Sequence, residues 1–525
     1  MTSFYGEYRD RQKDIISDEE ENQVSRANVD KWIFRLFLIL IGFMPLIVLG
    51  HTKDVISPLV SDVSLLTSGT KGDLFTYYKA FLVLLVTIIA GLLLLIKIFF
   101  MNGKIKKTIL NYFLGIFTFA IVMSTIFSPN ISIALSGQYN RNDGAISWLC
   151  YIALMFIAMN INYPKKAVNY IMFSLYPFVF INLYIITMNF TGNDLMQNKW
   201  VQTLVSIALP DGSSFSAGSQ IVGTLNQWNY MSGMFAILTV MFLVWAIVEG
   251  TWIKSIISVI VATLSITVMF MSISTSGFVT LLVMVPIIIV SVIKAVNKIK
   301  GTVILALFLL ISASVLHVLA SENSRVWDES LGFLIKNNPY LEEQAFSKIT
   351  SSFELGYMNE VSAADNSFVL PVLPERGVSA GTGRLYIWEK TIDVFKDRPI
   401  FGYGLDSLMY NFPHFNIDAR SGNWDENIIT DKPHNIFLGI LYGTGLVGFI
   451  GFLLLFVSVV VYSVTNLFKK IYIQNIVLVA AVLAYFVQSM FNDSLPGTSA
   501  IAWILIGMVF GIHSRKKHYG RNIHE

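Results

Sequence analysis

Five side chains able to bind an anion or to move a proton lie within one stretch of the chain: Arg384, Arg398, Arg420, His414 and His434. A guanidinium group suits a phosphate because it donates two parallel hydrogen bonds to it. An imidazole takes or gives a proton near neutral pH, since its unperturbed pKa is about 6.5. Each residue also has a plain structural explanation, as a salt-bridged arginine or a packed histidine. Their grouping favours a site that binds an anion and transfers a proton.

Arg384 is placed by a predicted amphipathic helix that runs from Thr382 to Arg398. Apolar residues recur along it at helical spacing and form one stripe: Leu385, Trp388, Ile392 and Phe395. We expect Thr382 to cap this helix and Pro399 to end it. Arg384 then lies in the first turn, beside free backbone N–H groups that favour an anion. Arg398 lies at the other end, where a cation also stabilises the helix dipole.

His434 stands in Pro433-His434-Asn435, directly before a long apolar segment. We expect it at the membrane surface, at the level of a lipid head group. Asn435 has two equal interpretations, because its amide can bind a sugar or cap the helix. For Trp388, packing is the first interpretation and stacking on a carbohydrate is the second.

The elements that must carry these residues are membrane helices. Hydrophobic residues make up 54% of the 525 residues and charged residues only 14%, whereas a soluble domain carries about 25% charged residues. A bilayer-spanning helix needs about 20 mainly apolar residues. Such stretches recur at 33–50, 77–100, 108–127, 145–161, 168–190, 228–248, 253–272, 277–293, 302–320, 436–467, 472–491 and 497–513. The sequence predicts an all-α, polytopic integral membrane protein with about twelve transmembrane helices.

The tenth apolar stretch is too long for one simple span. Its first part, from His434 to Gly445, predicts a short half-helix at the membrane surface. Gly443 and Gly445 loosen the helix there, because glycine weakens a helix interior.

Clusters of lysine and arginine set the predicted orientation, because cytoplasmic loops collect these residues. With twelve spans, every cluster falls on the side of the N-terminus, which makes both termini cytoplasmic. The predicted organisation is a cytoplasmic tail at 1–32, nine spans within 33–320, a large extracytoplasmic loop at 321–433, three spans within 434–513 and a cytoplasmic tail at 514–525. We expect the large loop to fold, since it contains aromatic residues that include Phe333, Phe346, Phe353 and Phe401.

Composition also argues against several classes of protein. The net charge of +3 gives no indication of a nucleic-acid partner. Cys150 is the only cysteine, so neither a disulfide nor a cysteine zinc site is expected. Charges are nearly absent from the middle of the predicted spans, which argues against a proton-coupled transporter. Residues 1–31 lack the pattern of a cleaved signal peptide, so we expect the first apolar helix to remain as an anchor.

Four motifs follow one another in the second half of the chain. They are Gly383-Arg384-Leu385-Tyr386-Ile387-Trp388, Pro399-Ile400-Phe401-Gly402-Tyr403-Gly404, His434-Asn435-Ile436-Phe437-Leu438 and Gly445-Leu446-Val447-Gly448. Their order and spacing resemble the signature of the O-antigen ligase and polymerase superfamily. Two upstream segments also resemble elements of that family, Arg141-Asn142-Asp143-Gly144 and the helix start at Asn226 to Tyr230.

The resemblance implies a GT-C-like membrane glycosyltransferase that needs no metal ion or other cofactor. Such an enzyme transfers a glycan from undecaprenyl diphosphate to a sugar hydroxyl on the outer face of the cytoplasmic membrane. Arg384 would stabilise the leaving diphosphate, and His434 would align or deprotonate the acceptor hydroxyl. The candidate substrate-binding residues are Arg420, Arg141, Arg398, Asn435 and Asn229.

One segment departs from the family pattern. Where many members have Ser-Arg-Gly near the outer end of a middle helix, this chain has Ser274-Thr275-Ser276-Gly277. A second phosphate-binding arginine must then come from elsewhere, and Arg420 and Arg141 are the candidates.

The motifs leave two reactions open. A polymerase joins two lipid-linked glycans, whereas a ligase passes the finished glycan to lipid A core, protein or wall glycan. We favour the polymerase, because nothing in the sequence indicates a particular non-glycan acceptor. The expected partners are the two glycan substrates, membrane lipids and a chain-length regulator or flippase of the same pathway. A transporter of lipid-linked sugars is the alternative of another class, and it predicts two similar halves that this sequence lacks.

Overall fold

The computed structural model describes residues 2–213, 221–225, 227–335, 337–341, 373–468 and 475–513, with side chains between residues 18 and 512 of these ranges. The first half contains α1 (Thr2–Gly42), β1 (His51–Val55), β2 (Gly69–Asp73), α2 (Tyr77–Phe100), α3 (Ile109–Ile126), α4 (Ile131–Ser136), α5 (Ala145–Asn160), α6 (Ala167–Ser174), α7 (Tyr176–Phe190), α8 (Lys199–Ser206) and α9 (Trp228–Val248). The second half contains α10 (Trp252–Met271), α11 (Thr275–Lys294), α12 (Lys298–Glu322), α13 (Arg325–Asp328), α15 (Arg384–Phe395), α16 (Ala419–Gly422), α17 (Ile436–Phe468), α18 (Asn475–Gln488) and α19 (Pro496–His513). The predictions made for Phe346, Phe353 and residues 514–525 lie outside the described residues.

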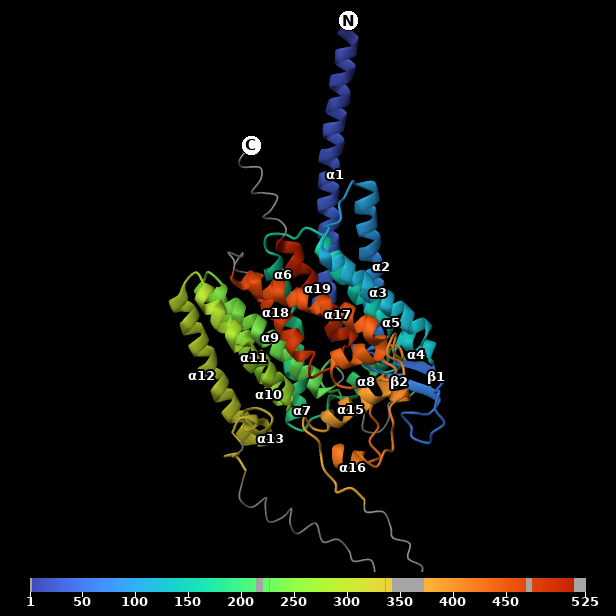
Figure 1. The fold of residues 1–525 in the computed structure, drawn as a ribbon. Coiled ribbons are helices and arrows are strands. Elements are labelled where there is room, and N and C mark those ends of the chain that lie inside the picture. Colours follow the sequence, from blue (N-terminus) through green and yellow to red (C-terminus); the bar gives the residue numbers. More distant parts are fainter. Residues whose placement is uncertain are drawn as a thin grey trace, which may run out of the picture.

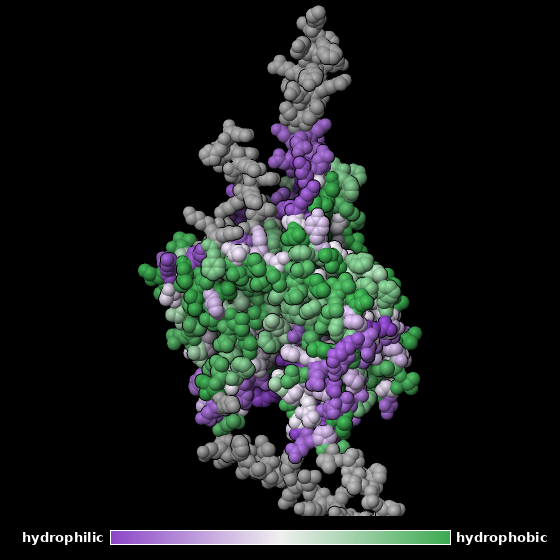
Figure 2. Space-filling view, in the orientation of Figure 1, coloured by the Kyte–Doolittle hydropathy of each residue, from purple (hydrophilic) through white to green (hydrophobic). Residues whose placement is uncertain are grey.

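The helices pack into one bundle whose two ends differ. The start of α1 projects from one end, while β1, β2, α15 and α16 lie at the opposite end (Figure 1). On the face shown in Figure 2, hydrophobic residues form a belt across the bundle, and hydrophilic residues gather beyond it at both ends. Within the described ranges, eight helical segments are long and apolar enough to cross a membrane, and α5, α18 and α19 are shorter apolar helices. The chain is a multi-pass helical membrane protein, as the sequence predicts.

The centre of the bundle is α9, which is buried from Tyr230 to Val248. A helix that is apolar all round can be enclosed by other helices without leaving polar side chains unsatisfied. Small residues let these helices approach closely: a side chain at Gly233 of α9 would collide with Gln488 of α18, and one at Gly277 of α11 would collide with Ser232 of α9.

The predicted half-helix at the start of the tenth stretch is confirmed. The helical backbone of α17 is interrupted by a kink at Gly445, which has φ 66° and ψ −169°. The Pro399–Gly404 turn docks at this kink: the N–H of Leu446 donates to the carbonyl of Pro399 over 2.8 Å, and the N–H of Gly404 donates to the carbonyl of Gly443 over 2.9 Å. The glycines of these two motifs therefore join the loop to the membrane helix.

The predicted amphipathic helix is α15, but its cap was predicted wrongly. The residue at the N-cap is Gly383, with φ 86°, and the hydroxyl of Ser379, not that of Thr382, accepts from the N–H of Tyr386 in the first turn. Thr382 also has positive φ and its Oγ1 donates to the carbonyl of Gly381. A left-handed residue suits glycine best, so the chain enters the helix through Gly383. Arg384 still occupies the first turn.

Three further differences from the sequence prediction are local. β1 and β2 form a small antiparallel sheet, in which His51 pairs with Asp73, inside a helical protein. The stretch 168–190 is divided at Leu175 into α6 and α7, with Pro177 in the first turn of α7. The first apolar helix begins well before residue 33, because α1 continues from Thr2.

Candidate active site

Four consecutive residues, Asp431 to His434, run across the end of the bundle where α15 lies. Each is held by a different part of the chain, and His434 has a backbone φ of 52°. Left-handed backbone costs a non-glycine residue free energy and persists only where the surroundings impose it, as at many functional sites. The contacts of these four residues define the candidate site.

His434 is oriented by a buried carboxylate. Its Nδ1 lies 2.9 Å from Oδ2 of Asp493, which belongs to the connection between α18 and α19. Burial alone would raise the pKa of Asp493, but His434 and, beyond it, Lys432 and Arg141 hold that pKa well below its ordinary value. An ionised carboxylate can only accept hydrogen bonds, so Nδ1 must be the donor. In the neutral ring, Nε2 then carries the lone pair and can accept a proton.

Asp431 is held by Arg141, from the turn before α5. The guanidinium Nη2 of Arg141 pairs with Oδ2 of Asp431, and its Nη1 donates to the hydroxyl of Tyr230 over 2.9 Å. The same hydroxyl lies 3.4 Å from Asp493. Arg141 is 1% exposed, so it is enclosed by protein rather than open to a ligand. It acts on the site through Asp431 and Tyr230.

Lys432 is held by two buried carboxylates. Its Nζ lies 3.2 Å from Asp406 and 3.4 Å from Asp143. Burial would lower the pKa of Lys432, but these two carboxylates raise it above its ordinary value. Asp143 is also bound by the hydroxyls of Ser494 and Tyr151. A buried charge is tolerated when it is paired and hydrogen-bonded. All three charges are paired here, while Oδ1 of Asp406 has no hydrogen-bond partner among the described residues.

Pro433 completes the series. The indole Nε1 of Trp388, one turn after Arg384 in α15, donates to the carbonyl of Pro433 over 2.8 Å. This bond fixes α15 against the residue that precedes His434. Trp388 is therefore a packing and positioning residue in this structure.

Arg384 differs from the other cations of the site. None of the described residues forms a hydrogen bond or ion pair with its guanidinium. Burial lowers the pKa of Arg384, while Asp493 and Glu329 lie near enough to oppose that shift. An arginine remains charged in proteins in any case. Arg384 thus presents a cation beside the His434–Asp493 pair, with its hydrogen-bonding capacity unused by the described residues.

The other predicted site residues have separate partners. Oδ1 of Asn435 accepts from the backbone N–H groups of Phe437 and Leu438, so Asn435 caps α17. Oδ1 of Asn229 accepts from Ser274. Arg398 donates to the carbonyl of Phe127, and Arg420 pairs with Glu426 over 3.2 Å. His414 approaches the carbonyl of Met409. None of these bonds joins the cluster around His434, and Asn226 lies outside the described residues.

Sequence reasoning missed the carboxylates of the site: Asp143, Asp406, Asp431 and Asp493. A signal for Asp493 was present, because it is the only acidic residue between Ile436 and His513. An acidic residue among membrane helices usually marks a functional site. The other three lie in polar loops, where an aspartate is ordinary.

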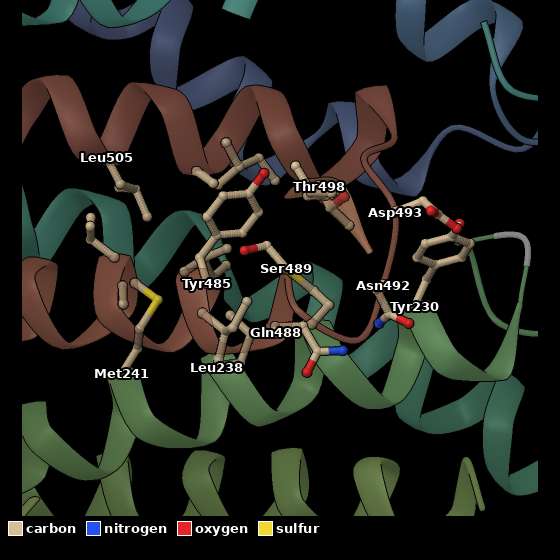
Figure 3. Close-up of a pocket in the computed structure, with 18 residues that line it drawn as sticks. Tyr230, Leu238, Met241, Tyr485, Gln488, Ser489, Asn492, Asp493, Thr498 and Leu505 are labelled. Atoms are coloured by element: carbon tan, nitrogen blue, oxygen red, sulfur yellow. The ribbon is translucent and has the colours of Figure 1, made fainter. Parts of the chain in front are cut away.

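Two small cavities meet at Asp493. One lies between α9, α18 and α19, with Tyr230, Gln488, Asn492 and Asp493 at one end and Leu238, Met241 and Leu505 towards the other (Figure 3). The second lies beside Lys432 and is lined by Asp143, Asp406 and Trp148 among others. Each has a volume of ≈ 40 Å³, which holds about three water molecules at ~10–15 Å³ each.

The fold and this cluster define a polytopic membrane protein with a buried ionic site at one end of its bundle. Residues 260–453 match the family model described as O-antigen ligase. The match contains Arg384, the Pro399–Gly404 turn, His434 and the kink at Gly445. No curated protein matches the chain. The family match supports a membrane enzyme of the glycan ligase or polymerase kind, with lipid-linked donor and acceptor substrates.

Proposed function

We propose that the chain polymerises oligosaccharide repeat units carried on undecaprenyl diphosphate, at the outer face of the cytoplasmic membrane. Both termini are then cytoplasmic, and the end of the bundle that holds α15 and His434 is outside. A chain-length regulator or a flippase of the same pathway is the proposed protein partner. One observation carries the proposal: Arg384 and His434 both lie near the carboxylate of Asp493. Asp493 orients the imidazole of His434, and the guanidinium of Arg384 has no hydrogen-bond partner among the described residues.

His434 acts on the acceptor in this proposal. Its Nε2 accepts the proton of the acceptor hydroxyl as that oxygen forms a bond to the anomeric carbon of the donor glycan. Asp493 stabilises the imidazolium that results, since it faces Nδ1 at 2.9 Å. A positioned base of this kind accelerates a reaction by roughly 10²–10⁴-fold.

Arg384 acts on the leaving group. The bond between the anomeric carbon and the diphosphate oxygen breaks, and the undecaprenyl diphosphate leaves with one more negative charge. A preorganised cation lowers the barrier when it faces the charge that develops. We assign no second arginine to the leaving group. Arg141 is enclosed by Asp431 and Tyr230, and Arg420 is paired with Glu426.

The test is reconstitution of the purified protein in liposomes with a lipid-diphosphate oligosaccharide. Longer lipid-linked products show a polymerase, and transfer to an added acceptor without longer lipid-linked products shows a ligase. Arg384→Ala and His434→Ala should each abolish measurable transfer. Lys396→Ala, which removes an exposed cation from the end of α15, is the matched control and should retain it. No transfer by the wild type with any lipid-linked donor would contradict the proposal.

A further inference from the structure

The apolar stripe of α15 lies on the outer side of the helix, although two of its residues, Trp388 and Phe395, are half-buried. Its four residues, Leu385, Trp388, Ile392 and Phe395, lie on one side of the helix, and Leu385 and Ile392 are 53% and 40% exposed. The opposite side of α15 is the buried one and carries Tyr386, Ile387 and Thr391. Exposed apolar residues that line up in this way mark a surface that contacts lipid or a ligand. We call these four residues the α15 stripe.

Charge is distributed unevenly around the α15 stripe. Arg384, whose guanidinium has no hydrogen-bond partner among the described residues, stands in the first turn of α15. Glu389 and Asp393 are exposed, helical spacing places them on the flank of the stripe opposite Trp388, and Asp393 pairs with Lys396. A ligand with an anionic head and an apolar chain fits this arrangement, with the head at Arg384 and the chain on the stripe. At 1.5 Å per residue the stripe is about 16 Å long, which accommodates several isoprene units.

Beyond α15, exposed apolar residues are found again where the Pro399–Gly404 turn meets α17. Ile400, 60% exposed, follows α15 in the chain, and its carbonyl accepts from the N–H of Val447. The neighbouring Leu446 and, one turn further, Ile450 are 46% and 53% exposed. Because α17 is long and apolar enough to cross a membrane, a lipid chain that extends past the exposed charged residues Lys396 to Arg398 meets apolar side chains again at Ile400 and α17.

The two cavities at Asp493 offer no comparable place for a lipid chain. They have volumes of ≈ 40 Å³ each, enough for a few waters only. Resting on the proposed function, we propose that the α15 stripe and Ile400 bind the isoprenoid chain of the lipid diphosphate, while Arg384 binds its diphosphate. α15 is then the donor-lipid subsite of the enzyme, and it aligns the glycosyl bond with His434.

Site-directed cross-linking tests this assignment. Cys150 is the only native cysteine and is buried, so Leu385→Cys and Ile392→Cys can be labelled singly with a maleimide benzophenone. Glu389→Cys and Asp393→Cys, on the acidic flank of the same helix, are the matched controls. The full-length protein in nanodiscs is irradiated with radiolabelled undecaprenyl diphosphate, which carries no glycan. We expect labelling from the stripe to exceed labelling from the acidic flank by about tenfold, and competition by unlabelled undecaprenyl diphosphate.

A second arm separates this lipid from bulk phospholipid. Phosphatidylglycerol in excess should not compete, and Arg384→Ala should lower stripe labelling about tenfold, as expected when a charge-assisted hydrogen bond is lost. Equal labelling from stripe and flank, or equal competition by phosphatidylglycerol, would overturn the proposal. The outcome is independent of catalysis: labelling without glycan transfer would contradict the proposed reaction alone, and transfer without stripe labelling would contradict the subsite alone.

Discussion

The indole of Trp388 and the carbonyl of Pro433 are joined by a 2.8 Å hydrogen bond. This bond connects the Arg384 motif to the His434 motif, which lie far apart in the chain. The bond explains the Arg-x-x-x-Trp pattern, because α15 carries Arg384 and, through Trp388, also fixes Pro433, the residue before His434.

Trp388→Phe should therefore slow transfer while the fold is kept. The ring still packs, but the N–H donor is lost, which costs about 1 kcal/mol. We expect a rate loss of roughly tenfold or more, since small displacements of a catalytic group are costly. Initial rates of transfer and thermal unfolding in detergent measure the two effects. An unchanged rate would show that the bond does not position His434.

Asp493→Asn should remove most activity without disrupting the bundle. An amide can donate to Nδ1, which favours the tautomer with the proton on Nε2 and removes the base. We expect a loss between about 10²- and 10⁴-fold. Asp418→Asn, at the surface pair with Lys390, is the control and should transfer at the normal rate. Retained activity in Asp493→Asn would show that His434 is not the base.

Gly445→Ala and Gly439→Ala should have opposite effects. Gly445 has φ 66°, and a side chain there would collide with the carbonyl of Ile400. Gly439 has conventional helical geometry and its nearest contact would be Pro433 at 3.8 Å. We expect Gly445→Ala to lower stability by about 1–3 kcal/mol and Gly439→Ala to raise it by about 0.5–1 kcal/mol. Thermal unfolding measures both effects. Melting temperatures that shift in the same direction in the two variants would contradict this expectation.

One contribution to the acid response comes from the two site aspartates with lowered pKa values, Asp431 and Asp493. For Asp431, burial opposes the shift, while Arg141 and His434 lower its pKa. Their contribution to stability is complete above the unfolded-state pKa of about 3.9 and is lost as the pH falls through their folded-state values. We expect this contribution to be constant from pH 7 to about 5 and to decline below about 4. Asp431→Asn should show a smaller acid-induced fall in melting temperature than the wild type.

The membrane helices could be predicted because a bilayer imposes one length and one composition on every span. The break at Gly445 could also be predicted, since glycines stood where the apolar stretch was too long. The cap of α15 could not, because a threonine before a helix is usually a cap and only the backbone shows that Gly383 takes that place. Periodicity identified the α15 stripe correctly, but it could not show that the stripe faces outward.

The candidate site was only partly visible in the sequence. Arg384 and His434 were recognised by residue type and motif, and their roles stay predictions. Asp493 was missed because its partner precedes it by two membrane helices, so no local spacing links them. The role of Arg141 could not be predicted from the sequence either, because its partners Asp431 and Tyr230 come from distant segments of the chain.

The same long-range assembly has a consequence for biogenesis. Arg141 lies before α5, whereas Asp493 lies in the connection between α18 and α19, so the ionic cluster joins early and late parts of the polypeptide. During synthesis, His434 emerges without its carboxylate and stays unoriented until α18 and α19 have been inserted. A chain that ends between His434 and Asp493 therefore contains the Arg384 and His434 motifs but lacks the carboxylate that orients the base. Such a fragment is expected to be inactive.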